Sequence, residues 1–282
     1  MKFLIPSLVL AGLAAAQSCV TSPPKGMQKE PCNKPEDCNY CYLTMQDLKT
    51  GPCKAITWIF ARASTELGNM GASVGTLIAI NLNQTYGAAN VAVQGVDYPA
   101  ALMDNVGGQG CAAKGISGAV ELFNMASTKC PNTIVVAGGY SQGTACMHAA
   151  IPQLKENVRQ QIAAVVLFGD TRAKQTGRTI KGLDASKYKI FCNNDTDAVC
   201  KGTLSITQAH FGYAPFVPEA TAFLKERIAA AKGGSSISSA EGAASAPAPK
   251  APKAPKAASP KASPKSMGGA MEGDGHSHGH SG

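Results

Sequence analysis

The pentapeptide Gly-Tyr-Ser-Gln-Gly, from Gly139 to Gly143, is the sharpest chemical feature of the chain. An apolar strand is expected over Thr133–Ala137 before it, and a helix is expected to begin at Gly143. A tight strand-to-helix turn with serine at its apex is called a nucleophile elbow. Glycines suit such a turn because a Cβ atom there would clash with neighbouring backbone. Ser141 is therefore the candidate nucleophile, and the amide of Gln142, at the helix N-terminus, is a candidate for stabilising an oxyanion.

A serine nucleophile needs a base, and few histidines are candidates. The chain has five histidines, of which three lie in the C-terminal tail. His148 lies on the same expected helix as Ser141 but about 10 Å further along, at 1.5 Å per residue, so we expect it to pack on the helix face instead. His210 follows the last expected strand. This position fits the chain order Ser, Asp, His that is typical of folds with a nucleophile elbow. We therefore assign the base to His210.

The acid that orients this histidine is less directly identified. Four aspartates lie between the serine and the histidine: Asp170, Asp184, Asp195 and Asp197. Asp184 lies in a polar connection, and Asp170 follows a strand, where it either caps the next residues or is the acid. Asp195 and Asp197 lie in the loop Cys192–Cys200, where a disulfide would hold a carboxylate still, as a catalytic histidine requires. Position favours this loop over Asp170 but does not separate Asp195 from Asp197.

Two kinds of segment alternate around these groups. Short apolar segments rich in β-branched residues predict strands over Ile56–Ala61, Val91–Val96, Thr133–Ala137, Ala164–Phe168 and Tyr188–Cys192. The stretches between and after them predict helices over Ala72–Tyr86, Ala112–Ser127, Gly143–Gln161 and Pro218–Ala231. The strands lack strict polar–apolar alternation, as expected when both faces are covered. We therefore predict an α/β fold, a three-layer sandwich with a central five-stranded parallel sheet.

The two ends of the chain differ from this alternating part. Residues 1–16 combine a lysine, an apolar run and small residues, which is typical of a secretory signal peptide. Residues 17–52 are polar and cysteine-rich, and we expect disulfides more than a core to hold them. Residues 233–282 are rich in alanine, proline and lysine with a histidine-rich end, which predicts a disordered tail. The folded domain is expected over 53–232, which excludes a multidomain enzyme and leaves no membrane-spanning run.

Charge and cysteine content narrow the class of protein further. The net charge is +8, but no cluster of lysine and arginine lies in the expected domain, which argues against nucleic-acid binding. Ten cysteines behind a secretory signal indicate disulfides and an extracellular protein. Cys32, Cys38 and Cys41 include one Cys-x-x-Cys pair without a partnering histidine, so we expect no metal there. Residues 108–113 superficially fit a dinucleotide loop but follow no strand, and we expect no cofactor.

Six sequence motifs between residues 53 and 228 are interpreted together as one set. They are Ile59-Phe-Ala-Arg-Ala-Ser-Thr-Glu66, Gly68-Asn-Met-Gly71, Gly139-Tyr-Ser-Gln-Gly143, Leu167-Phe-Gly-Asp170, Cys192…Asp197-Ala-Val-Cys200 and His210. This set resembles the fungal cutinases, within the cutinase and acetylxylan esterase group of serine esterases. The resemblance implies an α/β-hydrolase fold and a triad of Ser141, His210 and Asp197, the last because the family acid stands in an Asp-x-Val-Cys setting. It also implies an oxyanion hole formed by Ser64 and the amide of Gln142.

The same resemblance implies two disulfides, Cys53–Cys130 and Cys192–Cys200. It leaves six cysteines unexplained: Cys19, Cys32, Cys38, Cys41, Cys111 and Cys146. Six cysteines allow many pairings, so their partners stay open at this point. Cys146, on the helix after Ser141, is a candidate for a free buried thiol.

The sequence indicates the substrate less directly than it indicates the catalytic triad. Leu204, Ile206 and Phe211, near the expected base, resemble the apolar groove walls of cutinases. Such a groove favours fatty esters, because each buried acyl methylene contributes about 0.8 kcal/mol. The alternative is that these side chains pack in the core. The segment Val96-Asp-Tyr-Pro-Ala100 is more similar to acetylxylan esterases, which remove acetyl groups from plant polysaccharide, and it keeps that second function open.

The resemblance therefore predicts a secreted serine esterase acting on cutin-type polyesters and on short- to medium-chain acyl esters. Its partner would be cutin or a plant cell-wall polymer, and we expect a monomer that binds neither nucleic acid nor membrane. No metal or cofactor is expected in the reaction. A third interpretation, a non-enzymatic surface protein with a vestigial esterase fold, is disfavoured because the triad residues are all present.

Overall fold

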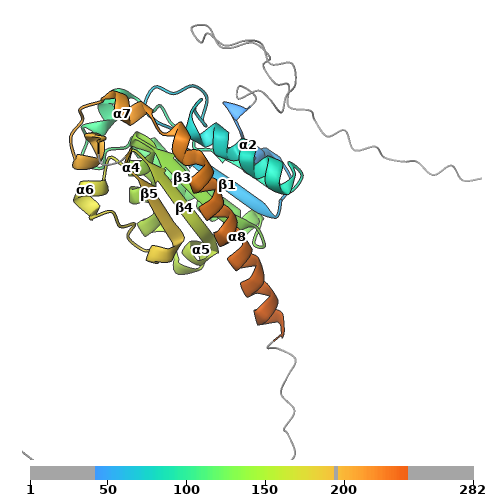
Figure 1. Ribbon diagram of the computed structural model, residues 1–282. Coiled ribbons are helices and arrows are strands. Elements are labelled where there is room, and N and C mark those ends of the chain that lie inside the picture. Colours follow the sequence, from blue (N-terminus) through green and yellow to red (C-terminus); the bar gives the residue numbers. More distant parts are fainter. Residues whose placement is uncertain (1–41, 194–195, 241–282) are drawn as a thin grey trace, which may run out of the picture. The chain divides into compact units, whose positions relative to one another are not determined.

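The computed structural model describes residues 42–193 and 196–240, and its centre is a five-stranded sheet with the order β2-β1-β3-β4-β5. The strands are β1 (Ile56–Ala61), β2 (Val91–Gly95), β3 (Ile134–Tyr140), β4 (Ile162–Phe168) and β5 (Tyr188–Phe191). All neighbouring strands are parallel, so their carboxyl ends meet at one edge of the sheet (Figure 1). The expected five-stranded parallel sheet is confirmed.

Helices cover both faces of this sheet. One face is packed by α2 (Val74–Tyr86) and α8 (Val217–Ala240), and the other by α3 (Ala113–Lys129), α4 (Gln142–Ala150) and α5 (Glu156–Gln161). In Figure 1, α8 is the long orange helix that runs past β4. The two helical layers and the sheet between them form the expected three-layer sandwich.

Strand β1 shows why the sheet is apolar on both sides. Ile56, Trp58 and Phe60 belong to the core cluster beside α2 and α8, whereas Ile59 and Ala61 belong to the cluster beside α3 and α4. Successive side chains of a strand point to opposite faces, and every residue of β1 is buried. A strand covered on both faces has no solvent side for polar residues, which explains its nearly continuous apolar sequence.

The helix expected over Gly143–Gln161 is interrupted in the structure. Helix α4 ends at Ala150, a 3₁₀ turn covers Ile151–Gln153, and α5 begins at Glu156. Pro152 lies in that turn. Its missing N–H and its ring prevent the α-helix from continuing. The prediction of one long helix is therefore wrong, because Pro152 divides the segment into two helices.

The described part of the cysteine-rich segment belongs to the core. Met45 and Leu48 lie within the expected segment 17–52, yet both are buried in the main apolar clusters. Asp47, in the short helix α1 (Asp47–Thr50), accepts a hydrogen bond from the backbone N–H of Val93 in β2. Packing therefore holds this part of the segment, in contrast to the expectation that disulfides would hold it.

Some of the sequence predictions concern residues outside the described ones. The signal peptide at 1–16, the first cysteines, Asp195 and residues 241–282 of the expected tail are among these. Residues 233–240 of that tail belong to helix α8, so the expectation of disorder is wrong for them. Over residues 42–193 and 196–240, no helix combines the length and the apolar character needed to cross a bilayer.

Three disulfides join described residues. Cys53–Cys130 and Cys192–Cys200, which the family resemblance implies, are both present. Cys146 is not a free thiol, because it pairs with Cys111. This third bond ties helix α4 to the segment that precedes α3, two elements that pack against each other in one core cluster.

Candidate active site

Ser141 lies at the turn between β3 and α4, as the pentapeptide predicts. Its backbone φ is 52°, in the left-handed region that a serine adopts only at an energetic cost. A Cβ atom at Gly143 would lie 1.9 Å from the carbonyl oxygen of Ala61, and one at Gly139 would lie 2.6 Å from the oxygen of Gly143. Only glycine therefore fits at both positions, and the turn leaves Ser141 at the carboxyl end of the central strand.

Ser141, His210 and Asp197 form one chain of hydrogen bonds. The Ser141 Oγ lies 2.9 Å from Nε2 of His210, and Nδ1 of His210 lies 2.8 Å from Oδ2 of Asp197. The three residues are 7%, 3% and 0% exposed, so water competes little for these bonds. His210 lies on α7 (Gln208–Phe211), and Asp197 follows β5. Segments far apart in the sequence thus bring a hydroxyl, an imidazole and a carboxylate together in the order that acyl transfer requires.

The carboxylate of Asp197 has partners besides His210. Its Oδ1 accepts a 3.0 Å hydrogen bond from the N–H of Val199, and its Oδ2 accepts a 2.7 Å bond from the Tyr213 hydroxyl. Burial by itself would raise the pKa of Asp197, but hydrogen bonds from His210 and Tyr213 outweigh burial and hold that pKa below its ordinary value. No motif in the sequence points to Tyr213, because its bond to Asp197 exists only in the folded chain.

A second histidine–aspartate pair lies further along α4. His148 Nε2 is 2.9 Å from Oδ2 of Asp170, whose Oδ1 accepts a 2.9 Å hydrogen bond from the N–H of Arg172. Asp170 therefore caps the residues after β4 and does not contact His210. Asp184 is engaged elsewhere, in a 3₁₀ turn where it accepts a backbone hydrogen bond. His148 packs on the helix face as expected.

Ser64 and Gln142, the expected oxyanion residues, lie at the ends of two different elements. Ser64 follows β1 and lines the same cleft as Ser141, and Gln142 is the first residue of α4. The Asn105 side chain donates a 2.8 Å hydrogen bond to Ser64 Oγ. Since that oxygen is the acceptor, the hydroxyl hydrogen of Ser64 is left to donate elsewhere. The Gln142 side chain donates to the carbonyl of Ala101 at 2.8 Å. The turn of residues 101–105 therefore contacts both Ser64 and Gln142.

Glu66, from the same family motif as Ser64, is a half-buried carboxyl in the cleft lining. Burial raises its pKa above the ordinary value, while hydrogen bonds from Ser73 and from the N–H of Ala63 act in the opposite direction. A Cβ atom at Gly71 would lie 2.3 Å from Oε2 of Glu66. The glycine that ends the motif Gly68-Asn-Met-Gly71 therefore makes room for this side chain.

A cleft of about 580 Å³ opens over Ser141 and His210. Its lining includes large apolar side chains that are 47% to 74% exposed: Leu102, Met103, Val106, Leu204, Ile206 and Phe211. Leu204, Ile206 and Phe211 thus lie in the cleft and do not pack in the core. The other three come from the turn η3 (Leu102–Asn105) and the residue after it, which no periodicity in the sequence marks. Over the described residues, no group of three His, Cys, Asp or Glu side chains is placed to hold a metal ion.

Comparison with known proteins identifies the family. A family model described as Cutinase matches residues 52–228. The chain belongs to the cutinase family. Cutinase CUT2 of Pyricularia oryzae is 43% identical, over 66% of this chain and 86% of that protein. A cutinase of Colletotrichum truncatum is 45% identical, over 66% of this chain and 84% of that protein.

Solved structures agree with this family assignment. Trichoderma reesei cutinase in complex with a C11Y4 phosphonate inhibitor is 34% identical with a TM-score of 0.57, covering 63% of this chain and 78% of that chain. The catalytic core domain of acetyl xylan esterase from Trichoderma reesei is 21% identical with a TM-score of 0.50, covering 62% of this chain and 99% of that chain. At that lower identity the likeness concerns the fold alone.

Proposed function

We propose that this member of the cutinase family is a serine esterase that hydrolyses cutin-type polyesters and short- to medium-chain acyl esters. The observation that carries the proposal is the hydrogen-bonded chain of Ser141, His210 and Asp197 inside a cleft with an exposed apolar lining. Similarity to proteins named cutinases supports the same activity. The hydrogen-bonded triad supplies a nucleophile that can attack an acyl carbon, and the apolar lining supplies a surface against which the acyl chain can pack.

In the proposed mechanism, His210 takes the proton of Ser141 as Oγ attacks the ester carbonyl. The oxyanion of the tetrahedral intermediate is stabilised by the amide of Gln142 and the hydroxyl of Ser64. The alcohol leaves with the proton from His210, and water then hydrolyses the acyl-enzyme through the same steps. Asp197 holds the imidazole in the tautomer that can accept the proton and stabilises the imidazolium that forms.

Two further residues are proposed to act through these groups. Tyr213 and His210 donate to the same oxygen of Asp197, so Tyr213 is a positioning residue for the carboxylate. Asn105 positions the Ser64 hydroxyl by donating to its oxygen. Donors that are already oriented need no rearrangement when negative charge develops, which is why an oxyanion hole lowers the barrier.

The apolar lining favours a fatty ester over a polar polysaccharide. Each acyl methylene that leaves water for such a surface contributes about 0.8 kcal/mol. The segment Val96–Ala100, which is more similar to acetylxylan esterases, supplies no residue to the cleft lining. Its Asp97 accepts hydrogen bonds from Gln46 and Asn69, and Tyr98 is buried. The segment therefore has a structural role here and does not favour the polysaccharide substrate.

A substrate panel tests this proposal. We expect hydrolysis of p-nitrophenyl butyrate and longer esters, together with release of soluble products from an insoluble polyester, because the lining can bury the acyl chain. Ser141→Ala provides the blank, since it removes the nucleophile and leaves the cleft walls in place. Acetate release from acetylated xylan that exceeds hydrolysis of the butyrate ester would favour the acetylxylan esterase function instead.

We also propose that the protein is secreted and acts as a monomer, without a nucleic-acid or membrane partner. The signal-like residues 1–16 support secretion, and the disulfides among the described residues are of the kind that forms in an oxidising compartment. Mass spectrometry of the protein from culture medium should find a chain that begins at Gln17. Size-exclusion chromatography should give the mass of one chain, and an intact residue 1–16 segment on cell-retained protein would contradict secretion.

A further inference from the structure

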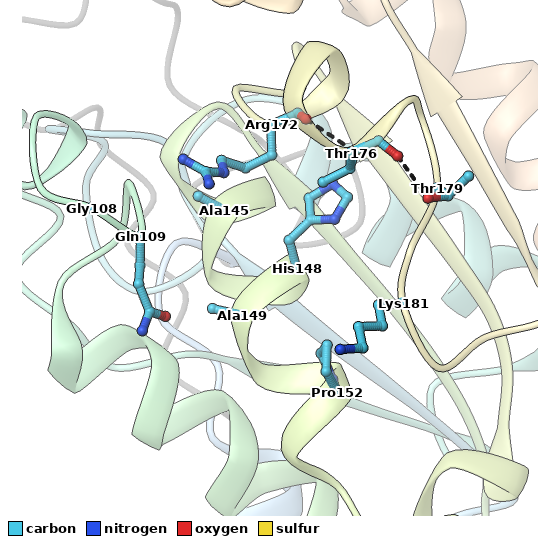
Figure 2. Close-up of a pocket in the computed structure, with 10 residues that line it drawn as sticks. All are labelled: Gly108, Gln109, Ala145, His148, Ala149, Pro152, Arg172, Thr176, Thr179 and Lys181. Carbon is cyan, nitrogen blue, oxygen red and sulfur yellow. Dashed lines mark hydrogen bonds between the residues drawn. The ribbon is translucent and has the colours of Figure 1, made fainter.

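A second cavity of about 430 Å³ lies beside helix α4, outside the proposed catalytic groups (Figure 2). One wall comes from α4 and the turn after it, with Ala145, His148, Ala149 and Pro152 in the lining. The rest of the lining consists of Gly108, Gln109, Arg172, Thr176, Thr179 and Lys181. The volume lies in the range of small-ligand pockets, about 300–1,000 Å³.

Two segments of chain are shared between this cavity and the catalytic cleft. Thr171 lines the cleft, and the next residue, Arg172, lines the cavity. The loop that places Leu102 and Val106 in the cleft continues to Gln109, which lines the cavity. The two hollows are therefore neighbours that share these two segments of chain as walls.

The cavity carries positive charge without a balancing anion. Arg172 and Lys181 both line it, and among the described residues neither the guanidinium nor the ammonium has an ion pair or a hydrogen bond. No aspartate or glutamate belongs to the lining. Asp170, which contacts His148, is fully buried and directs its two oxygens to that ring and to the Arg172 N–H. The free cationic ends in Figure 2 are thus left to bind an anion from solution.

We propose that this cavity binds the carboxylate group of a small acid. A guanidinium matches a carboxylate with two parallel hydrogen bonds, and an ammonium adds a point charge. Ala145, Ala149 and Pro152 offer apolar contact to the carbon chain behind the carboxylate. The inference rests on the proposed function, because each ester hydrolysis would form a carboxylate on the acyl product in the neighbouring cleft. The uronate groups of an acidic cell-wall polysaccharide carry the same chemistry, so both sources enter the test.

Isothermal titration calorimetry on the secreted full chain tests the proposal with three probes. They are 6-hydroxyhexanoate, its neutral amide 6-hydroxyhexanamide, and digalacturonate. We expect millimolar binding of the hydroxy acid and none of the amide. Arg172→Gln and Lys181→Gln should each weaken carboxylate binding about tenfold, because each removes a charged hydrogen-bonding partner. Lys155→Gln, which removes an exposed lysine outside the lining, is the matched control and should leave binding unchanged.

The outcomes separate the cavity from the proposed catalysis. Binding of digalacturonate that is tighter than that of the hydroxy acid, and is weakened by Arg172→Gln, supports the cavity and assigns the polysaccharide source. Failure of both acids to bind, or binding that is equal in wild type, Arg172→Gln and Lys181→Gln, overturns it. Hydrolysis of p-nitrophenyl butyrate is measured on the same samples and should be unchanged in all three variants. A wild-type protein inactive on that ester would contradict the proposed function without bearing on carboxylate binding.

Discussion

Two histidine–aspartate pairs lie in this domain, and their geometry is nearly the same. His210 is 2.8 Å from Asp197, His148 is 2.9 Å from Asp170, and both aspartates are fully buried. The pairs differ in which ring nitrogen faces the carboxylate. His210 uses Nδ1, so its Nε2 reaches Ser141 at 2.9 Å, whereas His148 uses Nε2 and lines a cationic cavity. We therefore propose a chemical role for the His210 pair alone, because its other ring nitrogen meets the Ser141 hydroxyl.

The two pairs also lie on different kinds of structural element. Asp197 lies in the loop closed by the Cys192–Cys200 disulfide, and His210 lies on the one-turn helix α7, so both belong to the segment that connects β5 to α8. His148 lies within α4 and Asp170 directly after β4, so their bond joins a helix to the end of a strand. Reactive groups are commonly carried by loops on a rigid scaffold, while bonds between regular elements hold the scaffold itself.

The largest expected difference concerns the two histidines. His210→Ala should lower kcat for p-nitrophenyl butyrate by about 10⁴-fold or more, because Ser141 loses its base. His148→Ala should leave kcat nearly unchanged and lower the free energy of unfolding by about 1–3 kcal/mol, because Asp170 loses a buried partner. Initial rates and urea unfolding measure the two effects. Similar losses of kcat in both variants would remove the distinction between the pairs.

The two aspartates should differ in the same direction. Asp197→Asn should lower kcat by about 10³- to 10⁴-fold, because the amide no longer holds His210 in the required tautomer. Asp170→Asn should retain nearly full kcat, since Asp170 contacts His148 and the Arg172 N–H. Both variants are compared with wild type on the same ester. An active Asp197→Asn would mean that another carboxylate orients the base.

We propose that only the His210–Asp197 pair works together with oxyanion donors, namely the Ser64 hydroxyl and the Gln142 amide. Ser64→Ala should lower kcat by about 10²- to 10³-fold with little change in KM, because its bond forms with the transition state. Asn105→Ala should have a smaller effect in the same direction, since Asn105 acts through Ser64. Asn90→Ala, which removes an exposed asparagine side chain bonded only to a nearby carbonyl, is the control. A large rise in KM with kcat intact would instead indicate a role in substrate binding.

The smallest expected effect is a change in the pH dependence of stability. A carboxyl whose folded pKa is lowered, such as Asp197, stabilises the fold above its unfolded pKa of about 3.9, and this stabilisation is lost as the pH falls through the folded value. Tyr213→Phe removes one hydrogen bond and should raise the pKa of Asp197. Wild type should therefore lose more stability than the variant between about pH 5 and pH 2, by about 0.5–1.5 kcal/mol.

Urea unfolding at both pH values measures this difference. Tyr140→Phe is the matched control, because the Tyr140 hydroxyl donates to the carbonyl oxygen of His210 and not to the carboxylate of Asp197. We expect Tyr140→Phe to keep the wild-type pH dependence. Equal pH dependence in wild type and Tyr213→Phe would show that the Tyr213 hydroxyl does not influence the carboxylate.

Local signals were sufficient to predict the sheet and Ser141. The strands are nearly continuous apolar runs because both faces of each are covered, and the glycines around Ser141 mark a turn in which a Cβ atom would clash. The contacts that support the site could not be predicted in this way. Asn105 meets Ser64 across 41 residues of chain, and Cys111 pairs with Cys146 across 35. Such pairs depend on how elements pack, which no short stretch of sequence encodes.

The backbone of Ser141 has a consequence for evolution and for engineering. A serine held at φ 52° retains strain of about 1–3 kcal/mol, whereas glycine adopts such a conformation freely. Ser141→Gly should therefore give a domain that tolerates heat better and hydrolyses nothing. A directed-evolution experiment that scores thermal tolerance alone would select against the serine, so every round of such a screen must also require turnover.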